Sequence, residues 1–472
     1  MTTRSSGLIV GALAFVMMLT AGAPNGITTP AWQVAALTLL MAIWWMTEAL
    51  PLTATALLPF LALPLMGVLN ANDVAKEYYS PILFLILGGA FLALAIERVG
   101  MHRRVAIAIV SRSGRSNGGL LFAFMMATAL LSMFISNTST ALIMLPIALA
   151  VLTAGGVKEG ETHGFSGALI MGIAFAASIG GLGTLVGSPT NAIAAALINK
   201  QLGIELNFLT WMQYGVPMVL LGIPVAAAIL YRVQNVGAAH FDVDLARQAI
   251  GDTGPWSVAE KRLLPIILIV IIAWMAQPWL ESILPKGAIT DGSIAVAGAL
   301  LLFIVPDGST QEGAKSRPLL TWKEADRAPW GVIMMFGGGL ALAAGITKSG
   351  LAAWLGEALQ PLTGVNPIII AIAVVALVIL ITEFASNVAT ASGIMPVIAS
   401  LILATGVDPW LLAMPAAIAA SWGFMLPSGT GPNALAWATG HIALPKMLKA
   451  GLALDVVGVP LIVGVVWMVG WL

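Results

Sequence analysis

Long apolar runs follow one another from end to end of this chain, and each is long enough to cross a membrane as a helix. Examples are 32–50, 263–280 and 451–471. Charged residues make up 9% of the chain, whereas a soluble domain carries about 25%. The sequence therefore predicts an all-α polytopic membrane protein. Net charge is zero, which gives no basic surface for nucleic acid, and the absence of cysteine excludes disulfides and thiolate metal sites.

Polar breaks divide the chain into about eleven transmembrane helices and two unusual segments. The unusual segments, 119–155 and 367–404, are too long for one span and have polar residues in the middle. Exposed backbone at membrane depth is tolerated only where it is buried in protein or lines a wet cavity. We therefore predict two re-entrant hairpins with polar tips that mark a site. The expected spans are 7–24, 31–49, 52–69, 80–97, 167–196, 213–231, 263–280, 292–306, 331–347, 411–437 and 451–471.

The distribution of basic residues supports this topology. With a cytoplasmic N-terminus and two hairpins that return to their own side, 17 of the 21 Lys and Arg residues are cytoplasmic. If each hairpin crossed the membrane, the split would be 11 to 10. The positive-inside rule favours the first arrangement. We expect a multi-pass protein of the inner (plasma) membrane with its C-terminus outside.

The two hairpins repeat each other at a spacing of 250 residues. Residues 134–141 (FISNTSTA) match 384–391 (FASNVATA), and downstream 187–192 (GSPTNA) resembles 429–434 (GTGPNA). We therefore predict two halves of inverted topology, an arrangement that places transported solutes where the halves meet. The expected organisation is an N-terminal helix at 1–30, a first repeat at 31–232 with a broken helix at 167–196, a cytoplasmic linker at 233–261, and a second repeat at 262–472 with a broken helix at 411–437.

The repeated tips suit a small cation and an anion together. Ser, Thr and Asn oxygens and freed backbone carbonyls are hard ligands, while helix N-termini favour negative charge. Neither hairpin core nor broken span contains Lys or Arg, so a buried anion needs another source of positive charge. Sodium ions bound at the tips would supply it. Glu383 lies beside the second tip, where the first has Met133, and intramembrane carboxylates are usually functional.

These residues resemble the divalent anion/sodium symporter family, of the sodium-dicarboxylate and citrate transporter type. The resemblance rests on the two tips, on 48–56 and on 88–97. It implies a homodimer in which each chain has a scaffold domain and a transport domain that moves as an elevator. It also implies no cofactor other than sodium as coupling ion, and transport of a small di- or tricarboxylate. No catalytic constellation suggests an enzyme.

The resemblance also implies particular site residues. A first sodium ion would be held by Ser132, Ser136, Asn137 and backbone near Gly183, and a second by Thr382, Ala385, Asn387 and backbone near Gly429. Substrate would be bound by Ser136, Asn137, Thr138, Ser386, Asn387 and Thr430.

The sequence departs from the family pattern at Val388, which lacks the usual hydroxyl, and at Gly431, where proline is usual. Two other functions stay open at this point. One is sodium-independent exchange of carboxylates, and the other is cation/proton antiport through Glu383.

Overall fold

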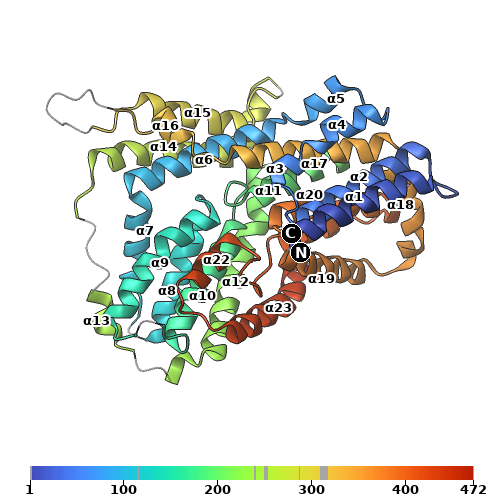
Figure 1. The fold of residues 1–472 in the computed structure, drawn as a ribbon. Helices are drawn as coiled ribbons and strands as arrows, with labels where there is room; N and C mark the ends of the chain where they lie inside the picture. Colours follow the sequence, from blue (N-terminus) through green and yellow to red (C-terminus); the bar gives the residue numbers. More distant parts are fainter. Residues whose placement is uncertain are drawn as a thin grey trace.

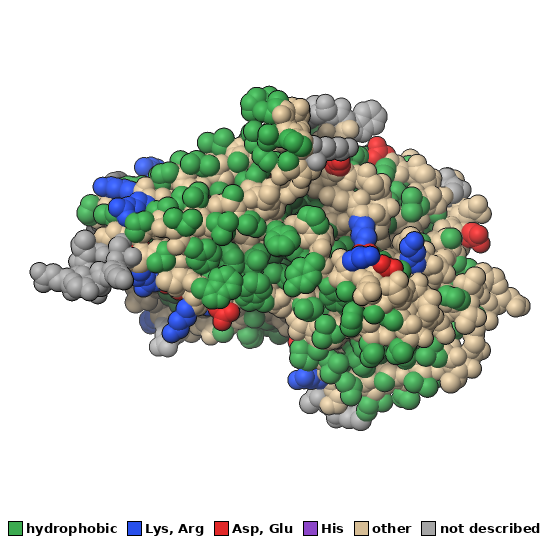
Figure 2. Space-filling model, turned by 90° about the horizontal axis from the view of Figure 1, so that it is seen from above, with side chains coloured by type: hydrophobic (Ala, Val, Ile, Leu, Met, Phe, Trp, Pro, Cys, Tyr) green, Lys and Arg blue, Asp and Glu red, His purple; other side chains and the backbone are tan. Residues whose placement is uncertain are grey.

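The computed structural model describes residues 3–114, 116–158, 160–238, 241–248, 254–285, 287–308 and 317–470. Within these ranges the chain is helical, and extended pairing is limited to one bridge between Pro306 and Pro318. Ten of the described helices are long and apolar enough to cross a membrane. Hydrophobic side chains cover much of the face in Figure 2, with few charged groups among them. The predicted all-helical membrane fold is confirmed.

Twelve helices precede the predicted linker in the described residues. They are α1 (Thr3–Ala21), α2 (Thr29–Met46), α3 (Leu52–Thr55), α4 (Leu58–Leu65), α5 (Ala71–Glu77), α6 (Pro81–Val99), α7 (Met101–Val110), α8 (Asn117–Ser132), α9 (Asn137–Ala154), α10 (Phe165–Gly181), α11 (Pro189–Leu202) and α12 (Phe208–Val233). The linker contains η1 (Val236–Ala238) and α13 (Val243–Gln248), while its residues 239–240 and 249–253 lie outside the described ranges.

The later helices repeat this order. They are α14 (Val258–Ile283), α15 (Asp291–Ile304), α16 (Trp322–Ala325), α17 (Trp330–Lys348), α18 (Leu351–Leu359), η2 (Gln360–Gly364), α19 (Pro367–Phe384), α20 (Asn387–Thr405), α21 (Pro409–Ala419), α22 (Gly431–Ala438) and α23 (Leu444–Gly470).

One expected span has a different structure. Residues 52–69 form the two short helices α3 and α4 instead of a single helix. Pro59 stands in the first turn of α4. Proline has no N–H to continue the backbone hydrogen bonds of α3, but it is well suited to the first turn of a helix. Helix α3 therefore ends before Pro59, and α4 begins beside it.

The two unusual segments are both helix pairs with a break at the polar tip. In the first, α8 and α9 are separated by residues 133–136, and in the second α19 and α20 are separated by 385–386. The segments after them are also interrupted, between α10 and α11 and between α21 and α22. Gly100 and Gly350, 250 residues apart, both end a helix with positive φ, 82° and 85°, a conformation that favours glycine.

The repeat extends further than the tip and break motifs. In α12, Gly215, Gly222 and Pro224 have the same spacing as Gly451, Gly458 and Pro460 in α23. A side chain at Gly215 would collide with the break after α10, and one at Gly451 would collide with the break after α21. These close approaches explain why both helices need glycine at the matching position.

The halves are interlocked. Helix α9 of the first hairpin packs on α22 of the other half, and α20 of the second hairpin packs on α11. Similarly, α6 packs on α15, and α17 packs on α3, α4 and α5. Helices α7 and α13 lie at one end of the molecule and α18 lies at the other (Figure 1). Each half therefore completes the packing of the other, and both tips belong to one shared core.

Candidate functional site

The first tip is held to the break after α10 by its own polar side chains. The buried Ser132 hydroxyl donates to the Ala177 carbonyl at 2.6 Å. With its amide turned to donate, Asn137 reaches Ser132 Oγ, the Ala177 carbonyl and the Gly187 carbonyl at 2.8, 3.1 and 3.2 Å. Ser136 caps α9 by accepting from the Ser139 N–H. These bonds fix the tip against the broken helix.

The second tip has a similar hydrogen-bonded cluster. Thr382 replaces Ser132, and its hydroxyl lies within hydrogen-bond distance of the Ala420 carbonyl, at 2.8 Å, and of Asn387 Oδ1, at 2.9 Å. Ser386 caps α20 by accepting from the Ala389 N–H. Ala385 lies between these residues and is buried. The structure thus joins Ser132 with Asn137, and Thr382 with Asn387, as two equivalent clusters.

Two further asparagines, which sequence reasoning left out of the site, tie each break together. Asn191 donates to the carbonyls of Gly181 and Thr184 at 2.7 and 2.8 Å, and Asn433 donates to the Leu426 carbonyl at 3.1 Å. Both side chains are fully buried, and the Oδ1 atom of each has no hydrogen-bond partner among the described residues. The signal was present, since both asparagines belong to the repeated break motif.

Backbone oxygens crowd one position in the first break. A Cβ atom on Gly187 would lie 2.5, 2.9 and 3.0 Å from the carbonyl oxygens of Gly181, Ser132 and Met133. The corresponding position at Gly429 is less crowded, with the Leu426 carbonyl at 3.3 Å. Predicted ligand Gly183 is buried in the same break. Backbone carbonyl oxygens are ligands suited to a hard cation.

One close contact joins the first tip directly to the second half. A Cβ atom on Gly431 would collide with Thr138 Oγ1, so glycine permits this close approach. Thr430 precedes this position, is buried, and caps α22 by accepting from the Asn433 N–H. The predicted substrate residues Thr138 and Thr430 are therefore neighbours across the two halves.

A cavity of about 180 Å³ opens beside the first tip. It is lined by Ser136 and Ser139 of the tip, by Ser188 of the break, and by Glu97 and Arg327. Arg327 pairs with Glu97, with Nη2 and Oε1 3.0 Å apart. Sequence reasoning missed Arg327, because it lies in a loop far along the chain from the tip.

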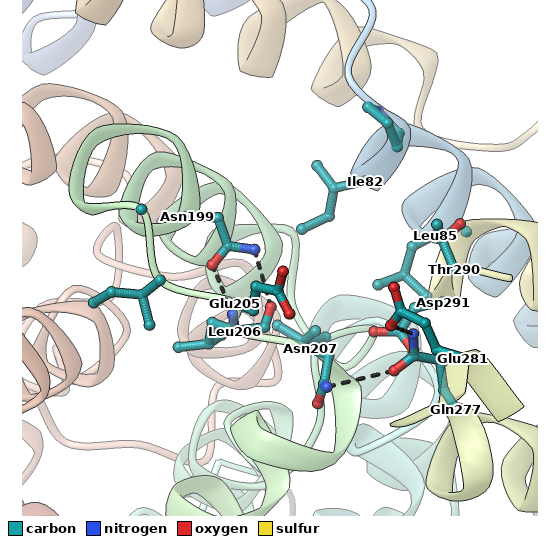
Figure 3. Close-up of a pocket in the computed structure, with 15 residues that line it drawn as sticks. Ile82, Leu85, Asn199, Glu205, Leu206, Asn207, Gln277, Glu281, Thr290 and Asp291 are labelled. Carbon is teal, nitrogen blue, oxygen red and sulfur yellow. Dashed lines mark hydrogen bonds between the residues drawn. The ribbon is translucent and has the colours of Figure 1, made fainter. Parts of the chain in front are cut away.

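A larger cavity, of about 430 Å³, contains none of the predicted site residues. Figure 3 shows Asn199, Glu205 and Asn207 on one side of it and Gln277, Glu281 and Asp291 on the other. The Asn207 amide donates across it to Gln277 Oε1 at 3.4 Å. Its charged lining is acidic, which disfavours an anion.

Taken with the fold, this geometry defines a class. An all-helical membrane protein whose two halves meet at broken helices and polar tips has the architecture of a secondary transporter. The chain belongs to the family described as "Sodium:sulfate symporter transmembrane region", whose model matches residues 2–472. The resemblance seen in the sequence is therefore confirmed.

Individual relatives agree with this assignment. The "Sodium-dependent dicarboxylate transporter SdcS" of Staphylococcus saprophyticus is 39% identical over 475 residues, covering 98% of this chain and 90% of that protein. The protein of the same name from Staphylococcus aureus (strain USA300) is 40% identical over 480 residues, with the same coverage. The family and these relatives are named as symporters and transporters, not as enzymes.

A solved structure shows a similar fold. The YdaH transporter of Alcanivorax borkumensis matches with a TM-score of 0.54 and 18% identity, covering 92% of this chain and 98% of that chain.

Proposed function

We propose that this protein is a secondary active transporter that carries a di- or tricarboxylate anion, of the succinate, malate, fumarate or citrate class, together with sodium ions. The observation that carries the proposal is the equivalence of the two tips, each with a hydroxyl, an asparagine and a neighbouring backbone carbonyl in one hydrogen-bonded cluster. Oxygen clusters of this kind suit a small hard cation. The names of the relatives support sodium as the coupling ion and a dicarboxylate as the substrate.

Charge balance explains the coupling. The tips contain no Lys or Arg, so a dianion between them would be uncompensated at a large cost in free energy. Two sodium ions, one at Ser132, Ser136, Asn137 and Gly183 and one at Thr382, Ala385, Asn387 and Gly429, would complete the anion site. Ser136, Asn137 and Thr138 would then bind one carboxylate, and Ser386, Asn387 and Thr430 the other.

The packing supports an elevator movement. Helices α8–α12 and α19–α23 enclose both tips and would form the transport domain, while α1–α6 and α14–α17 would form the scaffold and the interface of a homodimer. In this scheme the hairpins are re-entrant, the N-terminus is cytoplasmic and the C-terminus is outside. The cavity lined by Ser136 and Arg327 would be a path between the tip and the cytoplasm.

Uptake into proteoliposomes tests the proposal. Labelled succinate, malate, citrate and sulfate are offered with an imposed sodium gradient, and we expect carboxylate uptake that requires inward sodium. Uptake that requires only internal carboxylate would establish exchange. Sodium or proton flux without an anion, abolished by Glu383→Gln, would establish antiport. Either result would replace the proposed function.

A further inference from the structure

A pair of buried carboxylates lies in the second half, apart from the hydroxyl and amide clusters of the tips. Glu383 is the next-to-last residue of α19, and Asp455 lies in the middle of α23. Both lie against the backbone that follows α21: this backbone donates to Glu383, and a Cβ on Gly451, one turn before Asp455, would collide with it. The two acidic residues are only 3% and 5% exposed. Helices α19, α21 and α23 pack on one another.

The two carboxylates have different partners. Glu383 accepts hydrogen bonds from the backbone N–H groups of Phe424, Met425 and Leu426, with distances of 3.0 and 3.2 Å for the last two. The three amide donors fix the position of this carboxylate. Neither carboxylate oxygen of Asp455 has a hydrogen-bond donor among the described residues, and no described Lys or Arg forms an ion pair with either group.

Such a pair is costly without a positive charge. Adjacent carboxylates within the membrane repel each other strongly, and a buried charge without a partner of opposite sign is unfavourable. A single proton shared by the pair would still leave one negative charge without a neighbouring cation. A bound cation would accept lone pairs from both Asp455 oxygens and would compensate the charge of Glu383 as well.

The fold itself does not require these acids. The repeat places Met133 at the position of Glu383, and the Gly215–Gly222 and Gly451–Gly458 spacing places Val219 at the position of Asp455. Met133 and Val219 are also buried, at 8% and 4% exposed. The first half thus builds the same packing with two apolar residues, so the acid pair of the second half has a different purpose.

We propose that Glu383 and Asp455 form a third sodium site, which exists only in the second half. It is distinct from the clusters around Asn137 and Asn387. Asp455 provides two unpartnered carboxylate oxygens, and Glu383, fixed by three backbone amides, provides the second charge. The site rests on the sodium coupling proposed above and adds one ion to the two held at the tips.

Direct binding of radioactive sodium to the purified full-length protein in nanodiscs tests this site. We expect Asp455→Asn to bind one sodium ion fewer per chain than the wild type, and the Hill coefficient for sodium in succinate uptake to fall by one. Glu383→Gln, which also keeps the side-chain shape, should show the same loss. The matched control is Asp408→Asn. Asp408 is the exposed N-cap residue of α21, and asparagine caps a helix equally well.

The outcomes separate this inference from the proposed function. If the wild type shows no sodium-dependent uptake, the proposed function fails and the third site fails with it. If uptake is sodium-dependent but folded Asp455→Asn and Glu383→Gln bind as many sodium ions as the wild type, only the third site is overturned. A change confined to the pH dependence of uptake, with an unchanged sodium count, would show that the pair holds a proton and would also overturn it.

Discussion

Replacing Gly187 by alanine puts a methyl group among the three carbonyl oxygens of the first break. The new Cβ would lie 2.5 Å from the Gly181 oxygen, whereas ordinary contacts begin at 3.4 Å, so this oxygen has to retreat by about 0.9 Å. The oxygens of Ser132 and Met133, at 2.9 and 3.0 Å, have to move by about 0.5 and 0.4 Å. All three belong to the backbone, so no rotamer change relieves the contacts.

The energetic effect follows from that displacement. Overpacking of this kind costs about 1–3 kcal/mol. A functional site tolerates displacements of roughly 0.5 Å, so the movement at Gly181 is too large for a cation that uses these oxygens. If sodium binding has to reverse the displacement, the same free energy appears as a loss of about 5- to 150-fold in sodium affinity. We therefore expect Gly187→Ala to fold but to require much more sodium.

The assay is uptake of labelled succinate into proteoliposomes as a function of external sodium, with the folded fraction measured by size-exclusion chromatography. Gly393→Ala is the control, since a Cβ there meets no atom within 4 Å. Gly429→Ala should have a smaller effect than Gly187→Ala, because its nearest oxygen would be 3.3 Å away. A wild-type sodium dependence for Gly187→Ala would refute the reasoning that these carbonyls surround the ion.

Four other single substitutions and one double substitution test the tips. Asn137→Ala and Asn387→Ala should each abolish uptake while the protein still elutes as a folded species, and wild-type rates in either would remove the tips from the mechanism. Gly431→Ala should raise the KM for succinate and lower folding stability, because its Cβ would collide with Thr138 Oγ1. Adding Thr138→Ala removes the collision and should restore folding stability but not the KM. Val388→Thr restores a hydroxyl of nearly equal volume and should lower the KM for succinate about tenfold, the value of one hydrogen bond to a charged group; an unchanged KM would show that this position does not contact substrate.

The repeat was readable from the sequence only in part. Motifs gave the correspondence at a spacing of 250 for the tips and 242 for the breaks, because each motif is short and continuous in the chain. The match between α12 and α23 depends on Gly215, Gly222 and Pro224, which are separated by apolar residues. Their separation along the chain from the matching residues of α23 also differs from that of the tip motifs. The structure reveals it because both helices approach a break too closely for a side chain.

The sequence by itself determined that this is a helical membrane protein with two related halves and polar tips, because hydropathy, charge asymmetry and helix-breaking residues act over short stretches of chain. Tertiary structure decided which distant groups meet. It alone places the Ala177 and Ala420 carbonyls on the tip hydroxyls, and Thr138 against Gly431. It also places Asp455 beside Glu383. Those contacts arise from the packing of helices that are separated by tens to hundreds of residues, and no local pattern encodes them.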